Sequence, residues 1–276
     1  MNPHQALAIA QIVFYAPVVP IAFYVGIRAW KYGPRMAWYP PMPFALVRLA
    51  GGILVLVEQH NPRNTGIIIA TIVLLNIGLI PLIMTFHSLT RLIRLQTNYS
   101  DGILMKVFVK GTRLLIFVAV GLLSTAGGFT GDPANAHIQS TLSKVAYFEF
   151  LFVIMALNSM CLALYARQRH AIKQSQHIYL KWLLIACPLL YVRVTYGLLG
   201  VFNAIGNNMF TSLWSPLWGS AVAFALMALL PEYLVLGIYL YLGLHRSQTC
   251  TLESVVDERP VTKQPRTKAD GEDGVC

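Results

Sequence analysis

The stretch GIIIATIVLLNIGLIPLIMTFH, residues 66–87, decides the fold because it contains no Asp, Glu, Lys or Arg. An α-helix rises about 1.5 Å per residue and the hydrocarbon core of a membrane is about 30 Å thick, so about 20 apolar residues are needed to cross it. This stretch meets that length. It therefore predicts a transmembrane helix.

Six further apolar stretches accompany it along the chain. Of the 276 residues, 56% are hydrophobic and only 12% are charged, whereas about a quarter of the residues of a soluble domain are charged. The fold class that we predict is all-α, a polytopic membrane protein with seven transmembrane helices in one domain over residues 1–246. Besides 66–87, the predicted spans cover about 6–29, 41–57, 113–128, 142–165, 178–202 and 217–244.

The distribution of Lys and Arg predicts an orientation, because short cytoplasmic loops are enriched in both residues. Clusters follow the first, third and fifth predicted spans, and the other loops are nearly free of them. The N-terminus is therefore expected to face the lumen or exterior. Residues 247–276 are polar, mixed in charge and without apolar periodicity, which predicts a disordered cytosolic tail.

The sequence also narrows the partners and cofactors. The formal net charge is +10, and the basic residues lie mostly between the apolar stretches. The expected partner is therefore the lipid bilayer and not a nucleic acid. The four cysteines are scattered, which disfavours disulfides and zinc. Phosphate-binding loops, dinucleotide-binding motifs, hydrolase motifs and the DDxxD motif are all absent. No metal and no cofactor is expected.

Candidate chemistry rests on the few ionisable residues at membrane depth, because each costs at least a few kcal/mol there unless it is paired or hydrated. The acids are Glu58, Glu149 and Glu232, and the bases are Arg48 and Arg193. Arg193 and Glu149 are predicted at similar depth, which is compatible with a structural ion pair or with catalysis. Glu58 is either a carboxylate at the lumenal interface or a second catalytic group.

Glu232 is the strongest candidate for a catalytic acid. It directly follows Pro231, which removes a backbone donor and can kink the helix. A medium of low dielectric constant favours the neutral form of a carboxyl group, and a neutral carboxyl group can act as a general acid. Tyr191, Tyr196 and Trp218 are predicted nearby, where their rings either stabilise a cation or simply pack. With Arg48 and Arg193 they form the predicted substrate-binding set, in a pocket between the second, fifth, sixth and seventh spans.

Three segments carry a resemblance to a known family. LVRLAGGILVLVEQ surrounds Arg48 and Glu58, YFEFLF surrounds Glu149, and LLPEYLVLGIY surrounds Glu232. With seven short-looped spans, the chain resembles fungal seven-span membrane-bound terpene cyclases of meroterpenoid biosynthesis, of the ascochlorin and ascofuranone pathway type. In such cyclases one carboxylic acid early in the chain and another in the last helices are implicated in protonating a terminal epoxide. Glu58 and Glu232 occupy similar places.

The resemblance implies an enzyme of the endoplasmic reticulum membrane. It would be a lyase or isomerase that cyclises the epoxidised prenyl chain of a hydrophobic small molecule without a cofactor. Glu232 or Glu149 would protonate the epoxide, and Glu58 or a tyrosine would accept the final proton. Two alternatives stay open, a metabolite transporter or exporter and a seven-span receptor. The substrate, the ring formed and the oligomeric state are left open.

Overall fold

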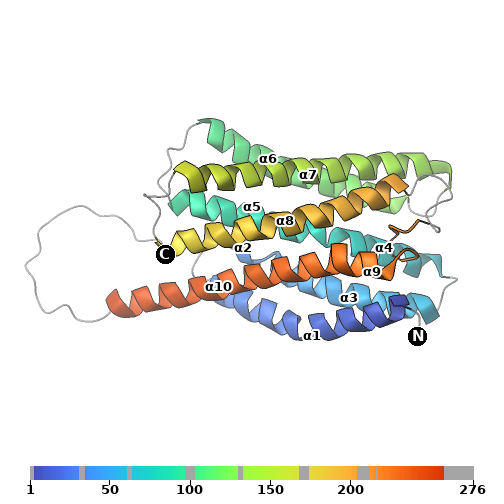
Figure 1. Cartoon of the computed structure of the whole chain (residues 1–276), viewed down its shortest axis with the longest axis horizontal. Helices are drawn as coiled ribbons and strands as arrows, with labels where there is room; N and C mark the ends of the chain where they lie inside the picture. The colour runs from blue at the N-terminus through green and yellow to red at the C-terminus, as the bar shows by residue number, and fades with distance from the viewer. Residues whose placement is uncertain are drawn as a thin grey trace, which may run out of the picture.

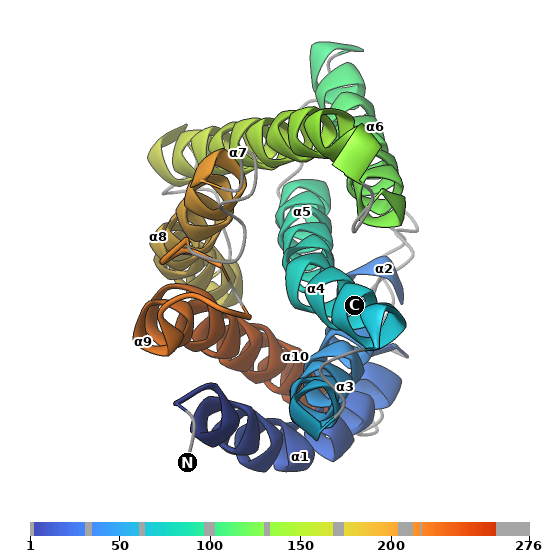
Figure 2. The ribbon, with the colours of Figure 1, turned by 90° about the vertical axis from the view of Figure 1, so that its right-hand side faces the viewer.

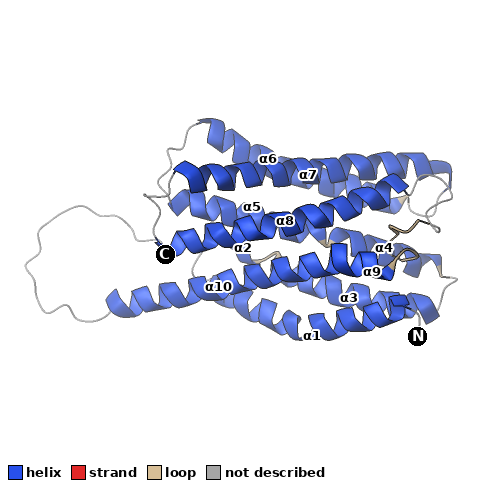
Figure 3. Ribbon diagram, viewed as in Figure 1, coloured by secondary structure: helices blue, strands red, loops and turns tan. Residues whose placement is uncertain are grey.

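The computed structural model of the chain is a bundle of long helices (Figure 1). It describes residues 3–30, 35–60, 64–96, 103–129, 133–167, 174–203, 212–215 and 217–257. These residues contain no strand, as Figure 3 shows. Seven helical segments are long and apolar enough to cross a membrane, which confirms the predicted class of an all-α polytopic membrane protein. The spans are Pro3–Ala29, Pro41–His60, Gly66–Arg94, Val107–Gly128, Ala136–Ala166, His177–Asn203 and Ala221–His245.

Most spans are single helices that extend beyond the predicted apolar runs. They are α1 (Pro3–Trp30), α3 (Pro41–His60), α6 (Ile103–Gly128), α7 (Ala136–Arg167) and α8 (Gln174–Asn203). The third span is built from α4 (Thr65–Ile77) and α5 (Leu79–Gln96), and the last from α9 (Ala221–Phe224), the π-helix η3 (Ala225–Leu229) and α10 (Leu230–Asp257). Short helices α2 (Arg35–Trp38) and η1 (Pro133–Asn135) lie in connections.

Helix α5 occupies the interior of the bundle. Seen end-on in Figure 2, α5 lies inside the arrangement of long helices, whereas α4 lies at its rim beside α3. Helix α5 contacts α3, α6, α7, α8 and α10. Its inward side chains are fully buried, including Leu82, Ile83 and Phe86. The third span, the most apolar stretch of the sequence, therefore holds the other spans together.

The third span is interrupted at Gly78, where the sequence predicted one continuous helix. Asn64 caps α4, its side chain accepting hydrogen bonds from the N–H groups of Gly66 and Ile67. Gly78 itself keeps helical backbone angles, with φ −54° and ψ −27°. Pro81 has no N–H to donate to Ile77, so the regular hydrogen-bond ladder is broken at this point.

The last span also departs from a regular α-helix. Ser220 caps α9, and the N–H of Leu230 bonds to the carbonyl of Ala225, five residues back, so that one π-helical turn precedes Pro231. Helix α10 then continues to Asp257, so the predicted disordered tail from residue 247 onward is wrong for its first part. The reason is that no Gly or Pro stops the helix between Gly243 and Pro260. Residues 258–276 of the predicted tail lie outside the described residues.

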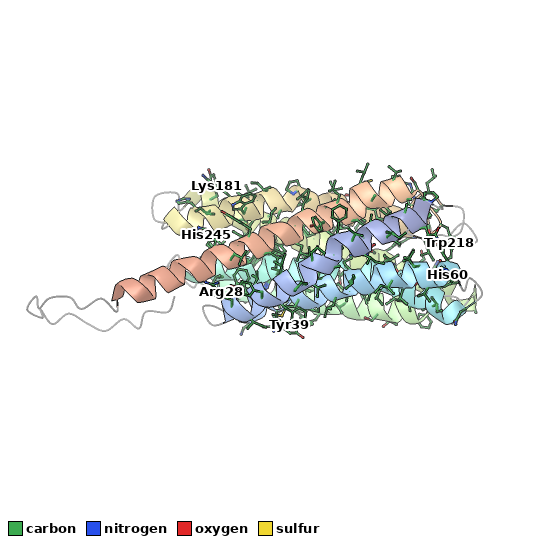
Figure 4. All side chains as sticks on the ribbon, turned by 90° about the horizontal axis from the view of Figure 1, so that it is seen from below. Arg28, Tyr39, His60, Lys181, Trp218 and His245 are labelled. Carbon is green, nitrogen blue, oxygen red and sulfur yellow. The ribbon has the colours of Figure 1, made fainter. Side chains whose placement is uncertain are left out.

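The two ends of the bundle differ in character. Figure 4 places Arg28, Lys181 and His245 toward one end and His60 and Trp218 toward the other, where α1 begins. We call the latter the N-terminal end. This separation agrees with the alternation of basic loops in the sequence, while the assignment of the cytosolic side stays a prediction.

Candidate functional site

Three charged side chains from three different spans meet in the interior of the bundle. Glu232 of α10 accepts hydrogen bonds at Oε1 from Arg48 Nη2 of α3 and from Arg193 Nε of α8. Their exposed fractions are 0% for Arg48, 2% for Arg193 and 0% for Glu232. We call these three residues the ionic centre. All three were predicted as site residues, but the sequence did not predict that they meet.

Two further spans contribute the immediate surroundings of the ionic centre. Gln11 of α1 donates from Nε2 to the backbone carbonyl of Arg48 at 2.6 Å, and Arg193 Nη2 donates to the carbonyl of Leu75 in α4 at 3.3 Å. Gly78 lies against the Arg48 guanidinium, so that a Cβ at this position would be 2.6 Å from Arg48 Cζ. The interruption of the third span thus lies where the guanidinium needs room.

The charges of the ionic centre do not balance. Two guanidinium groups, which stay protonated in proteins, face one carboxylate, and opposite charges within about 4–6 Å favour the ionised carboxylate. The sum is a formal excess of one positive charge. Among the described residues, Arg48 Nε, Arg48 Nη1 and Glu232 Oε2 have no hydrogen-bond partner. A buried charge costs several kcal/mol unless it is compensated, so the centre is suited to receiving an anion.

Two buried tyrosines border the ionic centre. Tyr15 of α1 is 2% exposed, and its hydroxyl lies within electrostatic range of Glu232 and Arg48. Tyr196 follows Arg193 by one turn of α8, and its ring packs on Trp214 and Phe224 with centroids 6.2 Å and 5.8 Å away. Neither hydroxyl has a hydrogen-bond partner among the described residues. They add neutral donors beside the charged ones.

The other two predicted acids lie away from the ionic centre. Glu58 belongs to the same helix as Arg48, ten residues closer to the N-terminal end, and it lies within electrostatic range of His4. Glu149 is half-buried on α7, and its Oε2 has no hydrogen-bond partner among the described residues. The considered ion pair between Arg193 and Glu149 is not formed, since Arg193 pairs with Glu232 instead.

The predicted aromatic residues are likewise divided. The buried apolar residues form a main cluster and a smaller one. Trp218 packs against the smaller cluster, which includes Tyr196, Leu217 and Phe224 and lies toward the N-terminal end. Tyr191 is half-buried, packs against the main core and is hydrogen-bonded to Asn158. Of the three predicted aromatic residues, Tyr196 is therefore the one that borders the ionic centre.

A cavity of about 50 Å³ lies between α4, α6 and α7. This cavity borders the third, fourth and fifth spans, so it is not the predicted pocket between the second, fifth, sixth and seventh spans. Four polar side chains line the cavity together with apolar ones, namely Asn76, Ser124, Gln139 and Ser143. No group of three His, Cys, Asp or Glu side chains that could hold a metal occurs within the part of the chain that the structure describes.

Sequence reasoning missed Gln11, Tyr15 and Gly78 as parts of the site. A glutamine inside an apolar span was a usable signal, because a side-chain amide at membrane depth needs a hydrogen-bond partner. A glycine and a proline three residues apart, Gly78 and Pro81, were a usable signal for an interrupted span. Tyr15 carried no such signal, since tyrosines occur throughout the chain.

The fold and the site define a polytopic helical membrane protein with a buried ionic centre. Residues 1–249 match a family described as a domain of unknown function (DUF7702), and the chain belongs to this family. No curated protein and no solved structure matches the chain.

Proposed function

We propose that the protein binds an organic monoanion at the ionic centre and that its activity is to carry such a molecule within or across the membrane. The observation behind the proposal is the buried excess of one positive charge, together with the unpartnered Arg48 Nε and Nη1. One carboxylate or phenolate would neutralise the excess. Guanidinium groups are the side chains best suited to carboxylate recognition because of their forked donors.

The helix geometry around the centre supports a carrier. In many transporters the substrate site lies near the middle of the membrane, where helices are discontinuous. Here the interruption at Gly78 touches the Arg48 guanidinium, and the π-helical turn 225–229 directly precedes the segment that bears Glu232. Local π-helical turns occur frequently at functional sites.

Binding to purified protein tests the proposal. Wild-type protein in lipid nanodiscs would be titrated with dodecanoate and separately with sodium chloride, and thermal unfolding would be followed by tryptophan fluorescence. We expect dodecanoate to raise the melting temperature in a saturable way. Stabilisation by chloride alone would assign the centre to an inorganic anion and overturn the organic ligand. If neither anion stabilises the protein, the ionic centre has a purely structural role and the proposal is overturned.

Matched variants make the test specific. Arg48→Met removes the excess charge but keeps the Arg193 to Glu232 pair, so we expect it to weaken dodecanoate binding at least about tenfold. Gly237→Ala lies on the same helix as Glu232, where a Cβ would have no neighbour within 4 Å. This control should bind like the wild type.

The predicted terpene cyclase is the second candidate, and one observation favours it. Glu149 has a buried Oε2 without a hydrogen-bond partner among the described residues, and no basic side chain pairs with it there. It therefore lacks the two guanidinium groups that face Glu232. The neighbouring rings of Phe148 and Phe202 pack edge to face at 5.9 Å, and ring faces can stabilise a cation.

Product analysis separates the two candidates. Microsomes that contain the wild type or the Glu58→Gln, Glu149→Gln or Glu232→Gln variants would be supplied with an epoxidised prenyl phenol. A cyclase predicts a new cyclic product that Glu149→Gln abolishes. A carrier predicts redistribution of the compound without any product. Full cyclisation by all three variants would exclude acid catalysis by these glutamates.

A further inference from the structure

The cavity between α4, α6 and α7 ends one side chain away from the ionic centre. Its inner wall includes Asn76, whose Oδ1 accepts a hydrogen bond from the Tyr147 hydroxyl at 3.2 Å. Tyr147 is 1% exposed, and its hydroxyl lies beside Arg193. Leu75, the residue before Asn76, supplies the carbonyl that Arg193 contacts. Tyr147 and Asn76 therefore stand between the cavity and the centre.

The cavity runs toward the N-terminal end of the bundle. It is lined there by the last turns of α6, including Ser124, and by the first turns of α7, including Gln139 and Ser143. Asn76 lies eleven residues from the start of α4, or about 16 Å by helical rise. The lining thus leads from the end of a span toward the middle of the membrane.

The lining offers hydrogen-bonding atoms to water beside its apolar side chains. The amide of Asn76 already bonds the Ile72 carbonyl and the Tyr147 hydroxyl, but an amide and a hydroxyl group can each take a further hydrogen bond, and a cavity of about 50 Å³ has room for a few water molecules. Figure 2 shows α4, α6 and α7 surrounding this side of the bundle at the N-terminal end, which faces the viewer. No charged side chain lines the cavity, so water and small polar solutes fit it better than ions.

We infer that this cavity is an aqueous vestibule that brings water from the N-terminal end of the bundle to Tyr147, which separates it from the ionic centre. Gly197 makes this wall possible. It lies one turn after Arg193 on α8, and a Cβ at this position would be 2.6 Å from Tyr147 Cζ. The tyrosine ring can thus lie directly against α8. The inference goes beyond the proposed anion site, because hydration of the vestibule does not require that an anion binds.

Cysteine labelling tests the vestibule, since a thiol reacts as its thiolate, which forms readily only in water. Single variants Ser143→Cys and Ser124→Cys would be made with Cys187 replaced by Ala and Cys250 and Cys276 replaced by Ser, and treated with methanethiosulfonate ethylammonium. Cys161 is the internal reference. It lies on the same face of α7 as Ser143, eighteen residues or about 27 Å along, and it is 0% exposed.

We expect the cysteine at the half-buried position 143 to react at least about tenfold faster than Cys161 in the same molecules. Position 124 is exposed and gives the rate of a surface thiol. The rate is always compared within one protein, so a loosened bundle, which would expose Cys161 as well, does not imitate the result. A ratio near one at position 143 would show a dry cavity and overturn the inference.

A second series tests Tyr147 as the inner wall. Tyr147→Cys lies one turn inward from Ser143 and should react at a similar rate to Ser143→Cys. Phe150→Cys lies one turn further, at a residue that is 0% exposed and packs on the Tyr147 ring with centroids 6.1 Å apart. It should react as slowly as Cys161. Fast labelling of Phe150→Cys would refute the assignment of Tyr147 as the wall, and slow labelling of Tyr147→Cys would place the wall at Ser143.

Discussion

Replacing Glu232 with glutamine tests the charge balance of the ionic centre most directly. The amide has nearly the same shape as the carboxylate, but both guanidinium groups lose their counter-ion at once. Breaking a buried ion pair by removing one partner costs about 3–5 kcal/mol, because an uncompensated charge stays buried. In the centre two such charges remain and repel each other. We therefore expect Glu232→Gln to reach the upper part of that range.

The magnitude converts into a measurable shift. For a chain of this size, a loss of about 3–5 kcal/mol lowers the melting temperature by about 6–20 °C, at about 2–4 °C for each kcal/mol. Thermal unfolding of ligand-free protein in nanodiscs, followed by tryptophan fluorescence, would measure it. Arg48→Met is the comparison, because it removes one charge but leaves a neutral pair of Arg193 and Glu232. Its cost should stay below about 2 kcal/mol.

The order of the two variants decides the argument. If Glu232→Gln unfolds at the same temperature as Arg48→Met or above it, the centre does not hold an uncompensated positive charge. The premise of the anion site would then be refuted. If Glu232→Gln is much less stable and dodecanoate, added in excess, restores part of the lost melting temperature, the added anion is compensating the charge that the variant exposes.

Three further substitutions probe the surroundings of the centre. Gly78→Ala places a Cβ against the guanidinium that it faces, so it should cost about 1–3 kcal/mol in the same melting assay, whereas Gly237→Ala should cause no loss. Gly197→Ala places a Cβ against the Tyr147 ring, so it should destabilise the protein by a similar amount. In the Ser143→Cys background it should accelerate labelling of position 143 more than labelling of buried Cys161. Gln11→Ala loses a buried hydrogen bond and should cost about 1 kcal/mol. A melting temperature for Gly78→Ala equal to that of Gly237→Ala would show that the guanidinium moves aside freely.

The seven spans could be predicted because length and polarity decide insertion in a membrane. The spans observed overlap all seven predicted stretches. The stretch 66–87 is among them, although its helix is interrupted in the structure. The interruption itself was not predicted. An apolar run has the same length and hydropathy whether or not one backbone hydrogen bond within it is missing. Likewise, no Gly or Pro marks the boundary between the last span and the helical extension that follows it, so α10 runs on to Asp257.

The charged members of the site could also be predicted, but their pairing could not. Arg48, Arg193 and Glu232 were evident because charges at membrane depth are costly. Depth along a helix does not give the direction in which a side chain points, and Glu149 lies at a depth similar to that of Arg193. The pairing depends on helix rotation and on the order of helices around α5, which arises from packing between residues distant in sequence.

The π-helical turn at Ala225–Leu229 has a consequence for how the chain tolerates changes in length. A turn of this kind accommodates one residue more than the α-helical turn that it replaces, so the segments on either side differ in phase by about 100° from a continuous α-helix. Deleting one residue within 225–229 would restore an α-helix and leave the segments on both sides near their present orientation, so that Glu232 still faces its two arginines. A deletion on α8 between Arg193 and Tyr196 would turn the two residues about 100° relative to each other. The last span therefore tolerates the loss of one residue at this turn while the ionic centre stays intact.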